Sequence, residues 1–197
     1  AGAGSPPGSR AVTPEIDAPG GRLLLRSLRS HPAQRYYLHV PRGAEGAGTV
    51  LVAVHGISRD AREQALAWRG LAREFGWPVI APLFDARCAP RYQRLGWDGG
   101  GPRAGELLDA IVADVAGELL APGARLVLAG YSGGAQFCHR YALARPTRVR
   151  ALICGAAGWY TWPDRALPWP LGCATAAPGP SRALDLDRFL GVPTLVY

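Results

Sequence analysis

The chain of 197 residues is 48 % hydrophobic and 19 % charged, a composition that suits one globular core and excludes disorder as the dominant state. No apolar run approaches the roughly 18 residues of a membrane-spanning helix, since the run over 49–54 ends at His55 and Gly56. All 22 basic residues are arginines and are scattered, so the net charge of +7 does not mark a nucleic-acid-binding tail. We therefore expect no membrane span and no nucleic-acid partner.

Residues 1–20 are rich in Gly, Ala and Pro and are expected to form a flexible N-terminal tail, which leaves 21–197 as one domain. The chain begins with Ala1 and contains no Met, which indicates a fragment or a processed piece. The cysteines form no C-x-x-C pair and no Cys/His cluster at zinc spacing, so no metal site is expected. Whether Cys88 and Cys173 form a disulfide stays open.

The first half of the chain alternates extended and helical patterns. Residues 22–30 and 35–40 predict an antiparallel pair of strands at a sheet edge. Residues 49–54 form an uninterrupted apolar run, typical of a strand that is buried on both faces. Apolar residues then recur every three or four positions over 60–76, which predicts a helix, and 78–84 predicts a second buried strand.

The second half continues this alternation after a long polar loop over 85–101. The expected elements are a helix over 104–119, a strand over 125–129, a helix over 135–144, a strand over 149–154, a short helix over 184–190 and a strand over 193–197. Regular alternation of strands and helices predicts an α/β fold with a doubly wound, mostly parallel sheet.

One glycine-rich turn carries the pattern of a reactive serine. Gly130-Tyr131-Ser132-Gly133-Gly134 is a G-x-S-x-G motif placed between a predicted strand and a predicted helix. The glycines at both ends let the backbone pass close to a strained Ser132, whose Oγ then projects above the sheet edge. The Gly133 amide lies at a helix start, where unpaired N–H groups and the helix dipole favour developing negative charge. The motif predicts Ser132 as nucleophile and Gly133 as an oxyanion donor.

A second segment falls where this chemistry needs it. His55-Gly56-Ile57 directly follows the first central strand and offers the Ile57 amide as the other oxyanion donor. A G-x-S-x-G string alone could arise by chance in a chain with 26 glycines. Two independent matches in the right order favour a serine nucleophile over that alternative.

With these two motifs the chain resembles the α/β-hydrolase fold family from about residue 20 onward. The segment Arg35-Tyr36-Tyr37-Leu38-His39-Val40-Pro41, leading into residues 50–56, is also similar to the polyhydroxybutyrate-depolymerase and feruloyl-esterase branch. The resemblance implies a Ser132 nucleophile, oxyanion donors at Ile57 and Gly133, no cofactor, and a small-molecule ester or acyl substrate. It also implies that His55 is structural and holds the oxyanion loop.

The chain departs from the family in its acid and histidine. The family order places both after the serine, on later strands, which implies that they follow Tyr197 and that the domain is C-terminally truncated. The 197-residue chain is then expected to be poorly active or inactive, because a serine without a general base is a weak nucleophile. His139 lies seven residues after Ser132 on the same helix, about 10 Å along its axis, and is expected to pack rather than react. Asp164 is a minor alternative for the acid.

An aromatic segment occupies 159–180, where this fold carries a cap or lid. Tyr131, Trp159 and Trp162 are candidate walls of an apolar acyl or aromatic-ester pocket, with packing of the insert against the sheet as the alternative. Two functional hypotheses follow. The first is a serine hydrolase that cleaves a carboxylic ester or related acyl bond through a Ser132 acyl-enzyme. The second is a non-catalytic binding protein of the same fold that lacks a complete triad.

Overall fold

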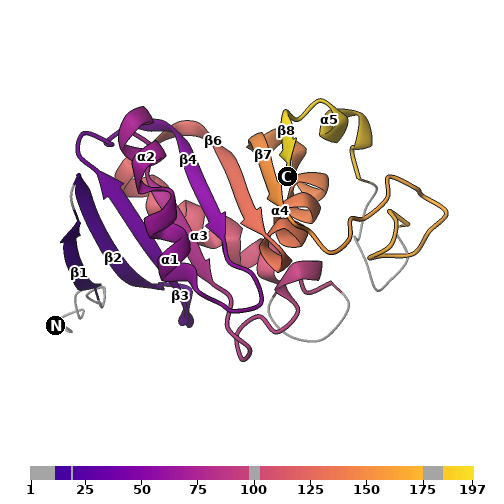
Figure 1. Ribbon diagram of the computed structural model, residues 1–197, viewed down its shortest axis with the longest axis horizontal. Coiled ribbons are helices and arrows are strands. Elements are labelled where there is room, and N and C mark those ends of the chain that lie inside the picture. Colours follow the sequence, from indigo (N-terminus) through magenta and orange to yellow (C-terminus); the bar gives the residue numbers. More distant parts are fainter. Residues whose placement is uncertain (1–11, 19, 98–102, 175–183) are drawn as a thin grey trace, which may run out of the picture.

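The computed structural model describes residues 12–18, 20–97, 103–174 and 184–197, which form one sheet with helices on both faces (Figure 1). The strands are β1 (Val12–Ala18), β2 (Gly21–Leu28), β3 (His31–Pro41), β4 (Ala47–Val54), β5 (Val79–Leu83), β6 (Leu120–Tyr131), β7 (Val149–Gly155) and β8 (Thr194–Val196). The helices are α1 (Ala61–Ala67), α2 (Arg69–Phe75), α3 (Ala104–Leu119), α4 (Gly133–Ala144) and α5 (Leu186–Leu190), with 3₁₀ turns η1 (Tyr92–Arg94) and η2 (Pro146–Arg148).

The strands that the structure describes follow the order β1-β2-β3-β5-β4-β6-β7-β8 across the sheet. β1, β2, β3 and β5 pair antiparallel with one another in that order. The strands β5, β4, β6, β7 and β8 are parallel, and a helical crossover joins each to the next along the chain. The doubly wound, mostly parallel sheet predicted from the sequence is therefore confirmed.

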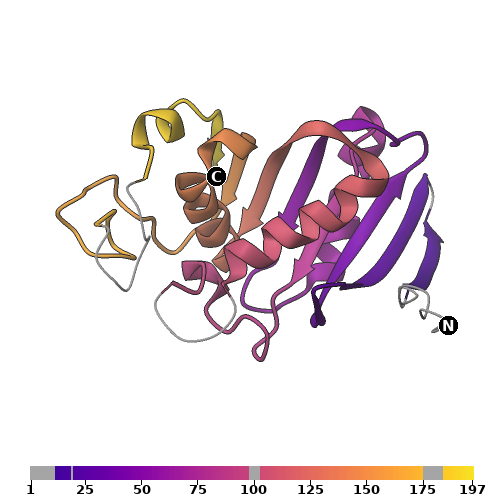
Figure 2. The same ribbon diagram turned by 180° about the vertical axis from the view of Figure 1, so that it is seen from behind.

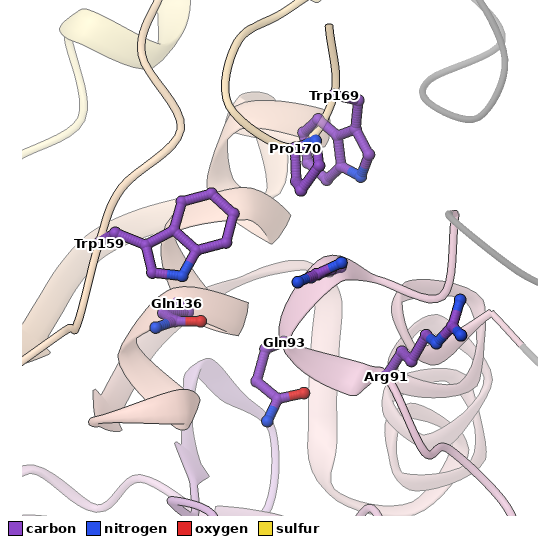
Figure 3. Close-up of a pocket in the computed structure, with 7 residues that line it drawn as sticks. Arg91, Gln93, Gln136, Trp159, Trp169 and Pro170 are labelled. Atoms are coloured by element: carbon purple, nitrogen blue, oxygen red, sulfur yellow. The ribbon is translucent and has the colours of Figure 1, made fainter.

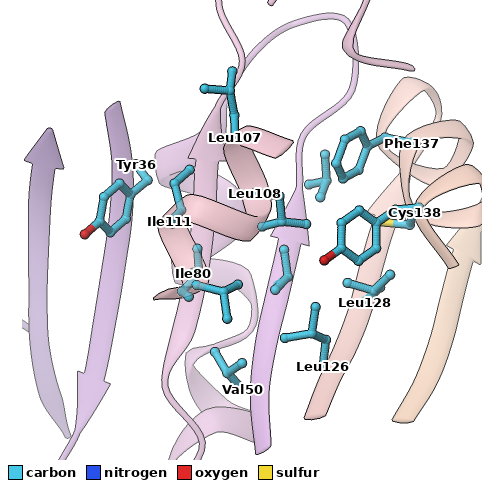
Figure 4. Close-up of a cluster of buried hydrophobic side chains, with 14 of the residues drawn as sticks. Tyr36, Val50, Ile80, Leu107, Leu108, Ile111, Leu126, Leu128, Phe137 and Cys138 are labelled. Carbon is cyan, nitrogen blue, oxygen red and sulfur yellow. The ribbon is translucent and has the colours of Figure 1, made fainter. Parts of the chain in front are cut away.

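Strand β4 shows how the sequence builds a core on each face of the sheet. Val50, Val52 and Val54 belong to one buried cluster, and Leu51 and Ala53 belong to the other, because successive side chains of a strand point to opposite faces. Helices α3 and α4 pack on the first cluster (Figure 4). Helices α1 and α2 pack on the second, so the two views from opposite sides show different helices in front (Figures 1 and 2).

The N-terminal prediction needs a correction. The flexible tail expected over 1–20 is wrong for Val12–Ala18, which pair with β2 from the Val12–Arg26 register to the Ala18–Gly21 register. This stretch contains Val, Thr and Ile, residues that favour strands, and it satisfies the backbone hydrogen bonds of what would otherwise be the sheet edge. Residues 1–11 and 19 lie outside the described part of the chain.

The single helix predicted over 60–76 is two short helices in the structure. It divides into α1 and α2 at Trp68, whose backbone has φ −92° and ψ 0°. Gly70, two residues further on, has a low intrinsic helix propensity, so the second half begins as a separate short helix. Gly76 ends α2 as predicted, in the left-handed conformation with φ 66°.

The carboxyl ends of the parallel strands meet along one edge of the sheet, where open α/β sheets bind their ligands. β4 ends before His55 and Gly56, β6 ends before Ser132, and β7 ends at Gly155. Hydrogen bonds at this edge join the segments directly. The Ser132 amide donates to the Gly155 carbonyl at 2.8 Å, and the Phe84 amide after β5 donates to the His55 ring at 3.0 Å.

Candidate active site

Ser132 occupies the sharp turn between β6 and α4. Its backbone has φ 53° and ψ −116°, a conformation that residues other than glycine rarely adopt. Its amide donates a hydrogen bond to the Gly155 carbonyl, and its own carbonyl accepts one from the Gln136 amide in the first turn of α4 at 3.2 Å. The turn therefore holds the serine side chain half-exposed at the sheet edge between two regular elements.

The two outer glycines of the motif are required by close backbone packing. A Cβ atom on Gly130 would lie 2.3 Å from the Gly134 carbonyl carbon. A Cβ atom on Gly134 would lie 2.0 Å from the Val54 carbonyl oxygen and 2.7 Å from that of His55. A side chain at Gly130 would therefore push α4 away from β6, and one at Gly134 would push α4 away from β4; either would move the serine.

The loop after β4 packs directly against the serine. A Cβ atom on Gly56 would lie 3.6 Å from the Ser132 Cβ, so the Gly56 backbone passes within van der Waals contact of the serine side chain. The next residue is Ile57, whose side chain is 75 % exposed. On the other side, Gly133 is the first residue of α4, and the first amides of a helix have no partner within the helix. The residue before Ile57 thus packs against Ser132, and Gly133 directly follows it in the chain. The assignment of the Ile57 and Gly133 amides as oxyanion donors stays a prediction.

His55 holds the loop by using both of its ring nitrogens. Its Nε2 accepts the Phe84 amide at 3.0 Å, which places the ring proton on Nδ1, and Nδ1 donates to the Gly56 carbonyl at 2.8 Å. The ring is fully buried, and this burial lowers its pKa below the usual 6.5. Its backbone carbonyl accepts the Tyr92 hydroxyl at 3.0 Å. The neutral ring has no nitrogen left for proton transfer.

The other histidines also lie away from the position of a general base. His139 is buried, and desolvation lowers its pKa to about 3; its Nε2 contacts the Thr161 carbonyl at 3.1 Å. His31 and His39 lie on β3, which β5 and β4 separate from β6, a distance of about 14 Å at ordinary strand spacing. None of the four histidines of this sequence is therefore placed to activate Ser132.

Asp164, the minor candidate for the acid, lies in the exposed loop after β7. Its carboxylate accepts the Ala166 amide at 2.7 Å, two residues further along the same loop. This contact stabilises a local turn. The assignment of Asp164 as a catalytic acid stays a prediction.

A cavity of about 660 Å³ lies beside the first turn of α4 (Figure 3). Its walls come from η1 and its preceding residue, from α4, and from the segment after β7: Arg91, Gln93, Arg94, Gln136, Trp159, Trp169 and Pro170. Gln93 links the cavity to the serine turn, because a Cβ atom on Gly133 would lie 3.2 Å from Gln93 Cγ and 2.8 Å from the Tyr92 hydroxyl. A residue that lines the cavity thus packs against Gly133, which follows Ser132 in the chain.

Of the three aromatic residues predicted to line a pocket, one lines the cavity and two are exposed. Trp159 lines this cavity, whereas Trp162 is 67 % exposed and Tyr131 is 52 % exposed, and neither is among its described lining residues. Trp169, which is 4 % exposed, forms the opposite wall. Of the insert predicted over 159–180, the irregular loop up to 174 is described and the remainder lies outside the described residues. Assignment of Tyr131 and Trp162 to a substrate pocket stays a prediction.

Arg140 of α4 joins the walls of the cavity and was not singled out by sequence reasoning. Its side chain is fully buried, donating from Nη1 to the Gln93 carbonyl at 2.8 Å and from Nε to Thr161 Oγ1 at 2.9 Å. Its guanidinium carbon lies 4.1 Å from the centroid of the Trp159 ring. Thr161 in turn donates to the Pro170 carbonyl at 2.7 Å. One arginine thus connects η1, α4 and the loop after β7.

The described part of the chain contains no group of three or more His, Cys, Asp or Glu side chains that could hold a metal ion. No helix within the described ranges is long and apolar enough to cross a bilayer. Cys88 and Cys173, whose pairing the sequence left open, are both free thiols, as are Cys138 and Cys154.

Comparison with known proteins identifies the fold. No protein-family model matches the chain, and no curated protein matches its sequence. A poly(3-hydroxybutyrate) depolymerase from Bordetella parapertussis is similar in structure, with a TM-score of 0.68 and 23 % identity over 95 % of this chain and 64 % of that one. Poly(aspartic acid) hydrolase-1 from Sphingomonas sp. KT-1 has a TM-score of 0.66 and 22 % identity, over 95 % of this chain and 70 % of that one.

A third similar structure is the fluorophosphonate-binding serine hydrolase F of Staphylococcus aureus, with a TM-score of 0.59 and 15 % identity, over 96 % of this chain and 79 % of that one. The chain thus spans about two thirds of the length of the first two structures. At sequence identities this low, the structural similarity shows a shared fold and nothing more specific. The chain has the α/β-hydrolase fold, as its serine turn and His-Gly loop predict.

Proposed function

We propose that the protein is a serine hydrolase that cleaves a carboxylic ester or a related acyl bond. The observation that carries the proposal is the backbone of Ser132, held at φ 53° on a helix start by glycines that no other residue can replace. A strained non-glycine residue at a sheet edge is costly and persists where the surrounding structure holds it for function. The neighbouring structures named as hydrolases support the same chemistry.

The proposed reaction uses the residues of the turn and of the loop after β4. Ser132 Oγ attacks the acyl carbon as its proton passes to a base, and the carbonyl oxygen becomes an oxyanion that accepts hydrogen bonds from the Ile57 and Gly133 amides. Collapse expels the alcohol, which takes up the proton and leaves an acyl-enzyme. Water then releases the acid and restores the serine. The proposal assigns the base to none of the four histidines, for the reasons of position and hydrogen bonding given above.

The placement of the histidines favours a second candidate, a non-catalytic binding protein with the hydrolase fold. Both ring nitrogens of His55 are occupied, and His139 is buried against Thr161. General-base assistance contributes about 10²- to 10⁴-fold to such reactions, so a serine without it is a poor nucleophile. In this candidate the cavity beside α4 binds a ligand and Ser132 does not react.

Active-site labelling separates the two candidates. The full-length protein is treated with a fluorophosphonate probe, and the modified residue is located by mass spectrometry. We expect labelling at Ser132, its loss in Ser132→Ala, and its retention in Ser30→Ala, a matched change at an exposed serine of the β2–β3 turn. Equal labelling of the Ser132→Ala variant, or no labelling of a protein shown to be folded by circular dichroism, would refute the enzyme and favour the binding protein.

A further inference from the structure

The cavity beside α4 is rich in hydrogen-bond donors and in positive charge. Its polar lining consists of Arg91, Gln93, Arg94 and Gln136 together with the two indole rings, and none of the described lining residues is acidic. The Trp169 indole nitrogen is buried and has no hydrogen-bond partner among the described residues. Donors of this kind fit a ligand group that only accepts hydrogen bonds, which an ionised carboxylate does.

A third guanidinium reinforces the positive potential from behind the wall. Arg140 lies 4.1 Å from the centroid of the Trp159 ring, and Arg94 lies 5.9 Å from the same ring. Because Arg140 is fully buried, its charge acts across a medium of low polarity and is screened less than a surface charge. Arg94 is an exposed residue that lines the cavity, and a planar guanidinium can bind a carboxylate with two parallel hydrogen bonds.

The position of the cavity relates this charge to the reaction. Gln93 and Gln136 line the cavity, and both also contact the serine turn, Gln93 through its side chain next to Gly133 and Gln136 through its amide on the Ser132 carbonyl. A substrate with its acyl carbon at Ser132 would therefore have a group a few atoms away beside Gln93 and Gln136, two of the lining residues labelled in Figure 3. The volume of about 660 Å³ is within the range of small-molecule sites.

We propose that this cavity binds a carboxylate of the substrate, so that the protein prefers esters that carry a carboxylate a few atoms from the scissile bond over neutral esters of the same size. Arg94 is the main binding residue in this proposal. Arg140 is a positioning residue, because it holds η1 and the loop after β7 through the Gln93 carbonyl and Thr161. The predicted preference among ester substrates rests on the proposed function, whereas the predicted binding of a carboxylate in the cavity does not.

The first test compares two esters of equal length. Mono-4-nitrophenyl glutarate carries a carboxylate, and 4-nitrophenyl pentanoate is its neutral counterpart. We expect the ratio of their kcat/KM values to favour the glutarate and to fall at least about tenfold in Arg94→Gln, chiefly through KM, with Arg94→Lys retaining part of it. Arg73→Gln, the same charge change on the opposite helical layer, is expected to leave the ratio unchanged.

The second test measures binding without catalysis. Glutarate and its neutral analogue glutaramide are titrated into the Ser132→Ala variant, and the fluorescence of the cavity tryptophans is recorded. We expect saturable binding of glutarate alone, weakened at least about tenfold by Arg94→Gln or, as a second variant, by Arg91→Gln. Equal binding of glutarate and glutaramide, equal effects of Arg94→Gln and Arg73→Gln, or tighter binding of inorganic phosphate than of glutarate would overturn the proposal.

These outcomes separate this proposal from the proposed function. Fluorophosphonate labelling of Ser132 without any preference for the carboxylate would overturn the carboxylate site alone. Glutarate binding that depends on Arg94, in a protein whose Ser132 is never labelled, would support the site and refute the enzyme.

Discussion

The strained backbone of Ser132 leads to a quantitative prediction about stability. Replacing Ser132 by Gly and by Ala removes the hydroxyl in both variants, but only Gly removes the Cβ that makes φ 53° and ψ −116° unfavourable. Such a conformation costs a non-glycine residue about 1–3 kcal/mol, and the greater freedom of Gly in the unfolded chain costs about 0.5–1 kcal/mol in return. We therefore expect Ser132→Gly to be more stable than Ser132→Ala by about 1 kcal/mol.

The difference is measurable by thermal unfolding followed by circular dichroism. For a chain of this size, about 1 kcal/mol corresponds to a Tm difference of about 2–4 °C, with the Gly variant melting higher. The matched control is Ser27 of β2, whose φ is not positive; there Gly is expected to be the less stable replacement, by about 0.5–1 kcal/mol. A Ser132→Gly variant that melts below Ser132→Ala would refute the reasoning that the serine turn stores backbone strain.

Two further predictions concern packing and pH. Gly134→Ala is expected to cost more than about 3 kcal/mol or to prevent folding, since its Cβ would lie 2.0 Å from the Val54 carbonyl oxygen. Gly117→Ala on α3, where nothing lies within 4 Å, should instead stabilise by about 0.5–1 kcal/mol in urea unfolding; similar effects of the two changes would contradict this. Burial lowers the pKa of His139 to about 3, so below pH 6.5 the unfolded chain binds a proton that the folded chain does not. Stability then falls as the pH decreases toward 3, and urea titrations between pH 6 and 4 should show a slope shallower by about 1.4 kcal/mol per pH unit in His139→Gln; an unchanged slope would count against burial of a neutral His139.

The architecture followed from local patterns because those patterns act over a few residues. The alternation of Val50 to Val54 between two buried clusters and the long apolar stripe of α3 are periodicities that a strand and a helix must bury. The errors arose where local signals were weak or competed. The glycine-rich start of the chain obscured the β-branched residues of β1, and a single stripe over 60–76 did not reveal the break at Trp68.

The candidate site divides in the same way. The serine turn could be read from the string of five residues, because the steric demand for Gly130 and Gly134 is created by their own neighbours and by the strand next to them. The contribution of η1 could not, since Tyr92 and Gln93 come from a polar loop without periodicity and reach the turn only after folding. Arg140 gave no signal in a chain with 22 arginines.

By itself, then, the sequence determined the order and type of the main elements and the place of the strained serine, because periodicity and glycine sterics are set by residues adjacent in the chain. Only the tertiary structure decided which side chains surround that serine. The Arg140 bond to the Gln93 carbonyl spans 47 residues, and the burial that keeps His139 neutral depends on a loop that returns to α4 at Thr161. Contacts of that range follow from how the whole chain packs, which no local pattern encodes.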